Sequence, residues 1–422
     1  MGAGNEAVFP NLLIWQQMYG EQMAGAGSIR PEIVGLPVVG LAHVDSPVTR
    51  GVAGSGLRGT GEFASQTHVI GVLPGEGSGP EVVAAALTVL EAVAVAVPGH
   101  RFDIRLGGPI GDQAIAQTGR PLSDDVANFC GQIFEERGAI LAGAGGDRFV
   151  YESRRRFRLN CKLNPLVPSA VPLAAHRMKP EALAGVDILV VRENMGGIYQ
   201  GTWSEFQSAT KGAWAEQTFL YTEPQIQQIV HKAAALARDR RGLLTVVTKP
   251  NGVPTISNLW LRCAREIATA YQIPLRELEI DYAAFALIQD PRQFDVIVTP
   301  NLFGDILSDV GGVLLGSRGL CYGGSFSDTG VAIYQTNHGA AHDLAGTDRA
   351  NPVGQIYSLA MMLRESFGLT REAIGIHAAV DQVWHKGVRT DDLAEPGCQS
   401  VGTQEMARLI AEAVRTNLAG CS

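Results

Sequence analysis

The sequence has 422 residues, of which 46% are hydrophobic and 18% charged, and its formal net charge is -8. This length suffices for two domains with a large core, and the composition excludes a disordered or fibrous protein. The basic residues are scattered, which disfavours nucleic acid as a partner. The longest apolar stretch, residues 82–97, contains Glu91 and is too short to span a bilayer, so we expect a buried helix and no membrane partner.

Residues 1–67 differ in composition from the rest of the chain. They contain a Gly-rich stretch at 51–61 and no long periodic pattern, apart from an amphipathic segment at 11–22. We expect a partly flexible N-terminal extension here. None of the six cysteines forms a CxxC pair, and the start of the sequence lacks the features of a signal peptide. These observations predict a cytoplasmic protein.

From His68 onward, short apolar runs alternate with longer segments of helical periodicity. The runs predict strands at 69–73, 102–106, 139–141, 188–191, 243–247, 275–281 and 295–298. The periodic segments predict helices at 81–97, 224–239, 257–271, 352–367 and 403–419. Because strands and helices alternate, the sequence predicts an α/β fold with a mainly parallel sheet and helices on both faces.

Two carboxylates, Asp305 and Asp309, follow an apolar run at 294–299 and stand four residues apart. This spacing is about one helical turn, so the two side chains share one helix face. Such a pair is most often a solvated face, but α/β enzymes bind ligands at strand-to-helix junctions. Converging carboxylates repel each other unless a cation lies between them, and oxygen ligands suit Mg²⁺ or Mn²⁺. We expect a metal site here.

Other polar side chains also follow apolar runs. Arg192 begins a segment with a Gly-Gly turn that ends at Tyr199, and Lys249 follows another predicted strand. A lysine can serve as a base where burial or a metal lowers its pKa, although a surface lysine in a turn is the commoner case. Asp281, at the end of the predicted strand that contains it, offers a third carboxylate.

An arginine cluster at positions 154, 155, 156 and 158 precedes Lys162 and Asn164. Such a cluster either binds a polycarboxylate or forms a solvated helix face. Further along, a loop rich in small residues runs from Tyr334 to Pro352 and leads into a helix. Small residues permit a flat ligand to approach the backbone closely.

In their order and spacing, three segments resemble the β-decarboxylating dehydrogenases, the family of isopropylmalate and isocitrate dehydrogenases. They are Arg-Glu-x-x-Gly-Gly-Ile-Tyr at 192–199, Asn-x-Phe-Gly-Asp-Ile-Leu-Ser-Asp at 301–309 and His-Gly-x-Ala-x-Asp-x-Ala-Gly at 338–346. The turn at 75–81 is similar to the family's Gly-Asp-Gly-Ile-Gly-Pro-Glu, with Glu76 and Ser78 as departures. The resemblance runs from about His68 to the C-terminus.

This resemblance implies a two-domain α/β fold with mainly parallel central sheets, which is not a regular Rossmann fold. Residues 68–159 together with 316–422 would form the cofactor-binding domain. Residues 160–315 would form the metal, substrate and dimerisation domain. The family works as a homodimer in which each active site is shared between the subunits.

The resemblance also implies roles for single residues. Asp305 and Asp309 would bind Mg²⁺ or Mn²⁺ together with Asp281 of the partner subunit. Lys249, also from the partner, would assist deprotonation of the substrate hydroxyl. Tyr199 would help to protonate the enolate carbon after CO₂ leaves.

Arg154 and Arg192 would hold the carboxylate that is lost, because a planar guanidinium binds a carboxylate through two hydrogen bonds. The family's usual Asn-x-Arg-Pro is Lys162-Leu-Asn164-Pro here, so Asn164 replaces a substrate-binding arginine. Lys162, on the same face of the strand, would supply the missing charge. Tyr151 is larger than the Leu-like residues that suit an isopropyl group, so we expect a related 2-hydroxy acid as the small-molecule substrate.

For the cofactor, the resemblance places His338, Gly339, Asp343 and Asn351 around the adenosine. A carboxylate at Asp343 accepts hydrogen bonds from the ribose hydroxyls of NAD and repels the 2′-phosphate of NADP. The NADP-using members carry Lys at this position. The resemblance therefore predicts NAD.

Three functions fit these residues. The first is NAD-dependent oxidative decarboxylation of a 2-hydroxy di- or tricarboxylic acid. The second is a tartrate-type oxidation without obligatory loss of CO₂. The third is a non-catalytic regulatory subunit, but such subunits typically lose the metal carboxylates, the lysine or the tyrosine. All five of these residues are present here, which favours catalysis.

Overall fold

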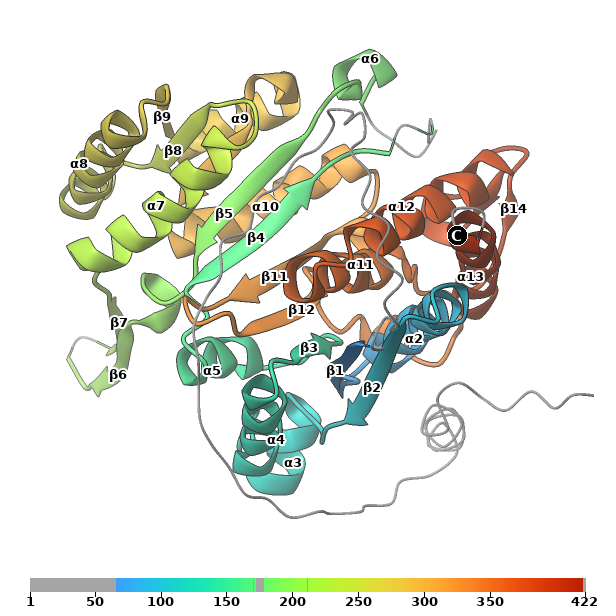
Figure 1. Cartoon of the computed structure of the whole chain (residues 1–422). Coiled ribbons are helices and arrows are strands. Elements are labelled where there is room, and N and C mark those ends of the chain that lie inside the picture. Colours follow the sequence, from blue (N-terminus) through green and yellow to red (C-terminus); the bar gives the residue numbers. More distant parts are fainter. Residues whose placement is uncertain (1–65, 170, 172–177, 211, 420–422) are drawn as a thin grey trace, which may run out of the picture.

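The computed structural model describes residues 66–169, 171, 178–210 and 212–419. Within these ranges, ten strands form one sheet in the order β2–β1–β3–β12–β11–β4–β5–β10–β8–β9 (Figure 1). The strands of this sheet are β1 (Gln66–Leu73), β2 (His100–Leu106), β3 (Ala139–Ala142), β4 (Cys161–Leu166), β5 (Ile188–Glu193), β8 (Leu244–Thr248), β9 (Leu275–Glu279), β10 (Val296–Thr299), β11 (Tyr322–Phe326) and β12 (Ala332–Thr336).

Most neighbours in this sheet are parallel. The pairs β11–β12, β11–β4 and β4–β5 are antiparallel, and the remaining six pairs are parallel. The expected α/β fold with a mainly parallel sheet is therefore confirmed. The domain boundaries at 159/160 and 315/316 stay predictions, and the amphipathic segment at 11–22 lies outside the described residues.

The larger helices follow the strands and cover both faces of the sheet (Figure 1). They are α2 (Gly79–Ala96), α4 (Asp124–Glu135), α5 (Phe149–Arg156), α7 (Glu223–Arg238), α8 (Pro254–Tyr271), α9 (Ile280–Gln289), α10 (Asn301–Leu315), α11 (Val353–Phe367), α12 (Thr370–His385) and α13 (Thr403–Ala419). The short helices are α3 (Asp112–Thr118), α6 (Pro180–Leu183), η1 (Ile198–Gln200), η2 (Pro291–Gln293), η3 (Arg318–Leu320), η4 (His342–Leu344) and η5 (Asp391–Leu393).

Strand β5 shows how the two faces are filled. All six of its residues are buried, as a central strand with helices on both sides requires. Alternate side chains enter different cores, because successive residues of a strand point to opposite faces. Ile188 and Val190 pack in the core that includes residues of α9 and α10. Leu189 and Val191 pack in the core that includes residues of α7 and α8.

The first and the last described helices lie side by side. Figure 1 shows α13 against α2, and α11 and α12 complete this layer. Helix α2 is long and apolar enough to cross a membrane by length and composition alone. However, 61% of its apolar window is buried inside the protein. The apolar stretch at 82–97 is therefore a core helix, as its sequence indicates.

A two-stranded hairpin stands apart from the central sheet. Strands β6 (Thr202–Ser208) and β7 (Gly212–Thr218) pair only with each other, and Figure 1 shows them projecting from the body. Nearly every residue in them is exposed, including Trp203, Phe206 and Trp214. The rings of Phe206 and Trp214 stack on each other, with their centroids 5.0 Å apart. The small pair β13 (Val388–Arg389) and β14 (Gln399–Ser400) also lies outside the main sheet.

One predicted boundary is wrong at a site residue. The strand expected at 275–281 ends at Glu279, and Asp281 is the second residue of helix α9. The apolar periodicity of the following helix begins within the apparent strand, so sequence alone places this boundary too late. Asp281 therefore projects from the first turn of a helix.

Histidine 377 gives the fold a pH-dependent stability. Its ring stacks on Tyr357, with ring centroids 4.3 Å apart. Burial, followed by the positive charge of Arg364, lowers the pKa of His377 from 6.5 to about 4. An unfolded chain takes up a proton near pH 6.5, whereas the folded chain does not until about pH 4. The free energy of unfolding therefore falls as the pH falls through this window.

We expect His377→Phe to weaken this pH dependence, because the substituted ring cannot be protonated in either state. The measurement is urea denaturation at about pH 7 and about pH 5 for both proteins. The wild type should lose more stability than His377→Phe over this interval. Equal losses in the two proteins would contradict this role for His377.

Candidate active site

Arg192, at the end of β5, is the centre of a buried polar network. Its side chain is only 2% exposed, although it carries a full positive charge. Its Nε and Nη2 donate hydrogen bonds to Asn301 Oδ1 at 3.0 and 2.8 Å, and its Nη1 forms an ion pair with Asp305. Gly304 allows this approach, because a Cβ there would lie 2.8 Å from Arg192 Cβ. The first turns of α10 are therefore fixed to the end of β5.

The turn after Arg192 is held by a second set of hydrogen bonds. The carboxylate of Glu193 accepts hydrogen bonds from the backbone N–H groups of Met195 and Gly196, at 2.6 and 2.9 Å. Asn301 Nδ2 donates to the carbonyl of Gly196 at 2.9 Å, and the Asn301 N–H donates to the Tyr221 hydroxyl at 2.9 Å. This turn leads into η1, so these bonds position Tyr199.

Tyr199 and Asp305 face each other. The Tyr199 hydroxyl donates a hydrogen bond to Asp305 Oδ2 at 2.8 Å. Burial, followed by this hydrogen bond, raises the pKa of Tyr199 above its ordinary value. Burial alone would raise the pKa of Asp305, but the charge of Arg192 and the Tyr199 hydroxyl hold it below its ordinary value. The pair is therefore a neutral phenol beside a carboxylate.

Three cationic side chains converge beside this pair. Lys162 on β4 lies directly opposite Arg192 in the antiparallel β4–β5 ladder, and Arg154 comes from the last turn of α5. Burial, followed by repulsion from Arg154 and Arg192, lowers the pKa of Lys162 well below its ordinary value. Burial, followed by the charge of Arg192, lowers the pKa of Arg154 to about 9. Arg154 Nη1 is buried without a hydrogen-bond partner among the described residues.

This arrangement offers positive charge and hydrogen-bond donors to an anion. Arg154 and Lys162 line the same small cavity between α5 and the sheet, together with Ser325 and Gln335. Like charges that are buried and unpaired cost free energy until an anion neutralises them. The predicted association of Arg154, Lys162 and Arg192 is thus present in the structure, next to Asp305 and Tyr199. Carboxylate groups suit such donors.

Asn164 was expected to take part in the same site. It lies on β4 two residues beyond Lys162, opposite Val190, and is fully buried. Neither its Oδ1 nor its Nδ2 has a hydrogen-bond partner among the described residues. Its amide therefore lies deeper than the cationic group, and it contributes no charge there.

An aromatic and cationic stack borders Tyr199, and sequence reasoning identified only part of it. The Tyr151 ring lies 5.3 Å from the Tyr199 ring. The Arg148 guanidinium lies over Tyr151 at 4.9 Å and over Trp203 at 4.6 Å, and it donates to the Tyr199 carbonyl at 3.0 Å. Cation–π contacts of this kind stabilise stacked side chains. Arg148 and Trp203 belong to no motif, so no sequence signal singled them out.

Lys249 and Asp281 form a separate group. Lys249 Nζ contacts Asp281 Oδ1 at 2.7 Å and Glu279 Oε2 at 2.6 Å. The hydrogen bond with Asp281, followed by the one with Glu279, raises the pKa of Lys249, and Lys249 lowers the pKa of Asp281. Among the described residues, neither side chain forms a hydrogen bond or ion pair with Asp305 or Asp309. Within one chain the predicted metal carboxylates therefore form two groups.

One of the residues expected around the adenosine, His338, is close to a predicted metal carboxylate. Burial lowers the pKa of His338, and the charge of Asp309 is among those that act on it. The buried His338 Nε2 has no hydrogen-bond partner among the described residues. Asn351 Nδ2 donates to Asp392 at 3.0 Å, and Asp343 is exposed in η4. A backbone carbonyl of this loop, that of Ala340, accepts hydrogen bonds from Ser78.

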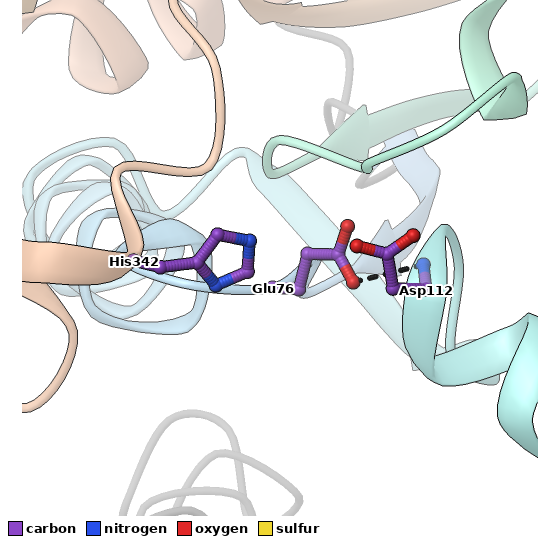
Figure 2. A group of neighbouring side chains, drawn as sticks. All are labelled: Glu76, Asp112 and His342. Carbon is purple, nitrogen blue, oxygen red and sulfur yellow. Dashed lines mark hydrogen bonds between the residues drawn. The ribbon is translucent and has the colours of Figure 1, made fainter.

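A different group of side chains meets the geometric requirement for a metal site in the described part of the chain. The ligand atoms of Glu76, Asp112 and His342 all lie within 4.8 Å of one another (Figure 2). Figure 2 shows Glu76 between the other two side chains. However, its carboxylate already accepts hydrogen bonds from the backbone N–H groups of Asp112, Gln113 and Gly146. Through these hydrogen bonds, Glu76 connects the turn after β1 to the segments that follow β2 and β3.

Comparisons with known proteins agree with this fold. The family model described as isocitrate/isopropylmalate dehydrogenase matches residues 69–410. A 3-isopropylmalate dehydrogenase of Geobacillus kaustophilus is 40% identical over 359 residues, which cover 82% of this chain and 95% of that protein. One from Aquifex aeolicus is 37% identical over 359 residues, covering 82% and 96%. The crystal structure of isocitrate dehydrogenase from Methylococcus capsulatus has a TM-score of 0.72 at 32% identity, covering 82% and 99%.

The chain therefore belongs to the isocitrate/isopropylmalate dehydrogenase family. The resemblance carried by the three sequence segments is confirmed. Membership of this family implies a nicotinamide cofactor and a divalent metal ion.

Asn301 should be essential for the stability of the site. Asn301→Ala removes the oxygen that accepts two Arg192 hydrogen bonds and leaves buried N–H groups unpaired. We expect a loss of about 3 kcal/mol in the free energy of unfolding, because hydrogen bonds to charged groups are costly to break. The measurement is urea denaturation at neutral pH.

Asn251→Ala is the matched control, since the exposed Asn251 donates a hydrogen bond to the half-buried Glu279 at 2.7 Å. This variant should lose about 1 kcal/mol or less. If Asn301→Ala were as stable as Asn251→Ala, the Arg192 network would not be what holds α10 in place.

Proposed function

We propose that the protein is an NAD-dependent dehydrogenase that oxidises a 2-hydroxy di- or tricarboxylic acid with loss of its β-carboxylate, using Mg²⁺ or Mn²⁺. The observation that carries this proposal is the group of three buried cations beside Tyr199 and Asp305. It offers donors for more than one carboxylate and a proton donor next to them. The names of the relatives, 3-isopropylmalate and isocitrate dehydrogenases, support the same substrate class.

The residues present fit the implied metal and cofactor. Asp281, Asp305 and Asp309 provide oxygen ligands, which hard divalent cations prefer. When bound, such an ion lowers the pKa of a substrate hydroxyl and stabilises negative charge on the oxygen. For the cofactor, the buried and unpartnered Nε2 of His338 offers a hydrogen-bonding atom. The exposed carboxylate of Asp343 supports NAD over NADP.

The proposed reaction assigns each step to groups of this chain. Arg154, Lys162 and Arg192 bind the substrate carboxylates and orient the C2–H bond. A bound nicotinamide would supply the acceptor for the hydride. Lys249 accepts the hydroxyl proton. It can do so once Asp281 and Glu279 no longer hold it as an ammonium, because both hydrogen bonds raise its pKa. The bond to the β-carboxylate then breaks, CO₂ leaves, and the electron pair forms an enolate. Tyr199 delivers a proton to its carbon.

A homodimer would unite the two groups of site residues. The face of α9 and α10 carries the exposed apolar side chains Tyr282, Phe285, Ile306 and Val313. Ile306 adjoins Asp305, and Tyr282 adjoins Asp281, so a subunit that covers this face also reaches both groups. We propose that a second copy of the same chain covers this face. Its Asp281 and Lys249 would complete the group of residues around Asp305. The projecting β6–β7 hairpin offers further aromatic surface.

We also propose a reducing, cytoplasmic location. The cysteines Cys130, Cys161, Cys263, Cys321 and Cys398, which lie in the described part of the chain, are all free thiols. Burial raises the pKa of the thiols of Cys130 and Cys161, so these two are protonated and unreactive at neutral pH.

Purified protein with NAD⁺ and Mn²⁺ should oxidise at least one member of a panel of 2-hydroxy di- and tricarboxylates. The measurement follows NADH and CO₂ together. Equal amounts of both support oxidative decarboxylation, whereas NADH without CO₂ would establish the tartrate-type alternative. Asp305→Asn should abolish the activity, because it removes the carboxylate that Arg192 and Tyr199 position. A regulatory subunit would give no NADH with any member of the panel.

Shared active sites predict that two inactive variants can complement each other. Lys249→Ala and Asp305→Asn subunits, co-expressed with different tags and purified as the mixed dimer, would contain one intact site. We expect about half of the wild-type kcat per dimer. The control is the mixed dimer of Asp305→Asn with Asp309→Asn, in which both sites are damaged. Sites contained within one chain would leave both mixed dimers inactive.

A further inference from the structure

Arg318 lies where the metal and the cofactor residues meet. It begins η3, three residues after the end of α10. Its Nη2 donates to Asp309 Oδ2 at 2.9 Å, and the two side chains are 66% and 48% exposed. Exposed ion pairs of this kind contribute about 0–1 kcal/mol, so Arg318 can leave Asp309 at little cost. No motif assigned a role to this arginine.

The backbone of Arg318 is held rigidly against the proposed adenosine site. Ser317 Oγ accepts a hydrogen bond from the Gly319 N–H at 3.0 Å and donates to Asp392. Asn351 donates to the same Asp392 carboxylate at 3.0 Å. A Cβ at Gly319 would lie 2.8 Å from Asn351 Cβ, which shows how closely this turn approaches Asn351. The mobile part of Arg318 is therefore its side chain.

His338 faces the same place from the loop after β12. Burial lowers its pKa, and the charges of Arg318, Asp309 and Asp392 all act on it. Arg318 thus pairs with Asp309, which is expected to bind the metal, and its charge acts on His338, which is expected to bind the cofactor.

The charges around this point create a problem for a dinucleotide. A pyrophosphate bound here would carry two negative charges, and Asp309 and Asp392 would repel it. A guanidinium satisfies a phosphate through two parallel hydrogen bonds. Arg318 can supply them only if its Asp309 ion pair is given up. A divalent ion on Asp309 would release the arginine, because the carboxylate then has another cation.

We propose that Arg318 is a cofactor-binding residue that holds Asp309 in the absence of metal and the pyrophosphate of the dinucleotide when metal occupies Asp309. The inference rests on the proposed metal and cofactor sites. Metal and dinucleotide would then strengthen each other's binding. The metal takes Asp309 and frees Arg318 for the pyrophosphate, and the pyrophosphate takes Arg318 and frees Asp309 for the metal. By linkage, the factor by which Mn²⁺ tightens NADH binding equals the factor by which NADH tightens Mn²⁺ binding.

Arg318→Met tests this exchange by binding measurements that need no turnover. NADH fluorescence titrations with and without Mn²⁺, and Mn²⁺ titrations followed by electron paramagnetic resonance, give both affinities and their coupling. In the wild type we expect Mn²⁺ to tighten NADH binding about tenfold. In Arg318→Met, NADH binding in the presence of Mn²⁺ should weaken about tenfold, and the coupling should disappear. Mn²⁺ binding without NADH should become tighter, because Asp309 no longer has a competing cation.

Three comparisons make the result specific. Arg120→Met, which removes another exposed arginine that pairs with one aspartate, should leave both affinities unchanged. Arg318→Lys should retain part of the coupling, since it keeps the charge but not the two parallel hydrogen bonds. ADP-ribose, which has the pyrophosphate, should bind more weakly to Arg318→Met than to the wild type, whereas adenosine should bind both proteins equally.

The possible failures are distinguishable. If the wild type binds neither NADH nor Mn²⁺, the proposed function is wrong. If it binds both but Arg318→Met shows the same affinities and coupling, Arg318 has no such role. A loss that is equally large for adenosine would show that the substitution disturbs the turn at η3, and it would also overturn the proposal.

Discussion

The buried Arg192 is the constraint on which the site depends. A guanidinium that is almost fully removed from water must be neutralised and hydrogen bonded, and the first turns of α10 do both through Asn301 and Asp305. This requirement fixes where α10 begins relative to β5. It also fixes Asp305, which in turn fixes the hydroxyl of Tyr199. A single charge at a strand end thereby determines the positions of the proposed metal carboxylate and the proposed proton donor.

Each chain holds an incomplete set of charges. The group around Arg192 has three cations, and only one of them is directly paired with a carboxylate among the described residues. The group around Lys249 has two carboxylates on one ammonium. Neither group alone has the ligands for a metal ion and the base for a hydroxyl. Their exposure beside apolar side chains of α9 and α10 explains why association of two copies would create function as well as stability.

Sequence alone could locate most of the site because strand ends of a parallel sheet gather at one edge. Arg192, Lys249 and Asp305 were predictable in this way. The antiparallel register that puts Lys162 opposite Arg192 was not, because pairing partners far apart in sequence leave no local signal. Sequence alone predicts Asp281 at the end of a strand, whereas it lies in the first turn of α9. The apolar helix α9 directly follows the short strand β9, so no loop marks the boundary between them. The contact of Arg148 with Tyr199 and the proposed role of Arg318 were not predictable. A single arginine outside a sequence motif gives no signal that distinguishes it from other surface arginines.

The convergence of Arg154, Lys162 and Arg192 has a consequence for how this protein evolves. Mutual repulsion among desolvated cations opposes folding, and the rest of the core must outweigh it in the empty protein. Any lineage that lost the substrate would gain stability by replacing Arg154 or Lys162 with a neutral side chain, because Arg192 alone of the three is paired with a carboxylate among the described residues. Retention of Arg154 and Lys162 in a descendant would therefore indicate continuing selection for an anionic substrate, because these two unpaired charges make the empty protein less stable.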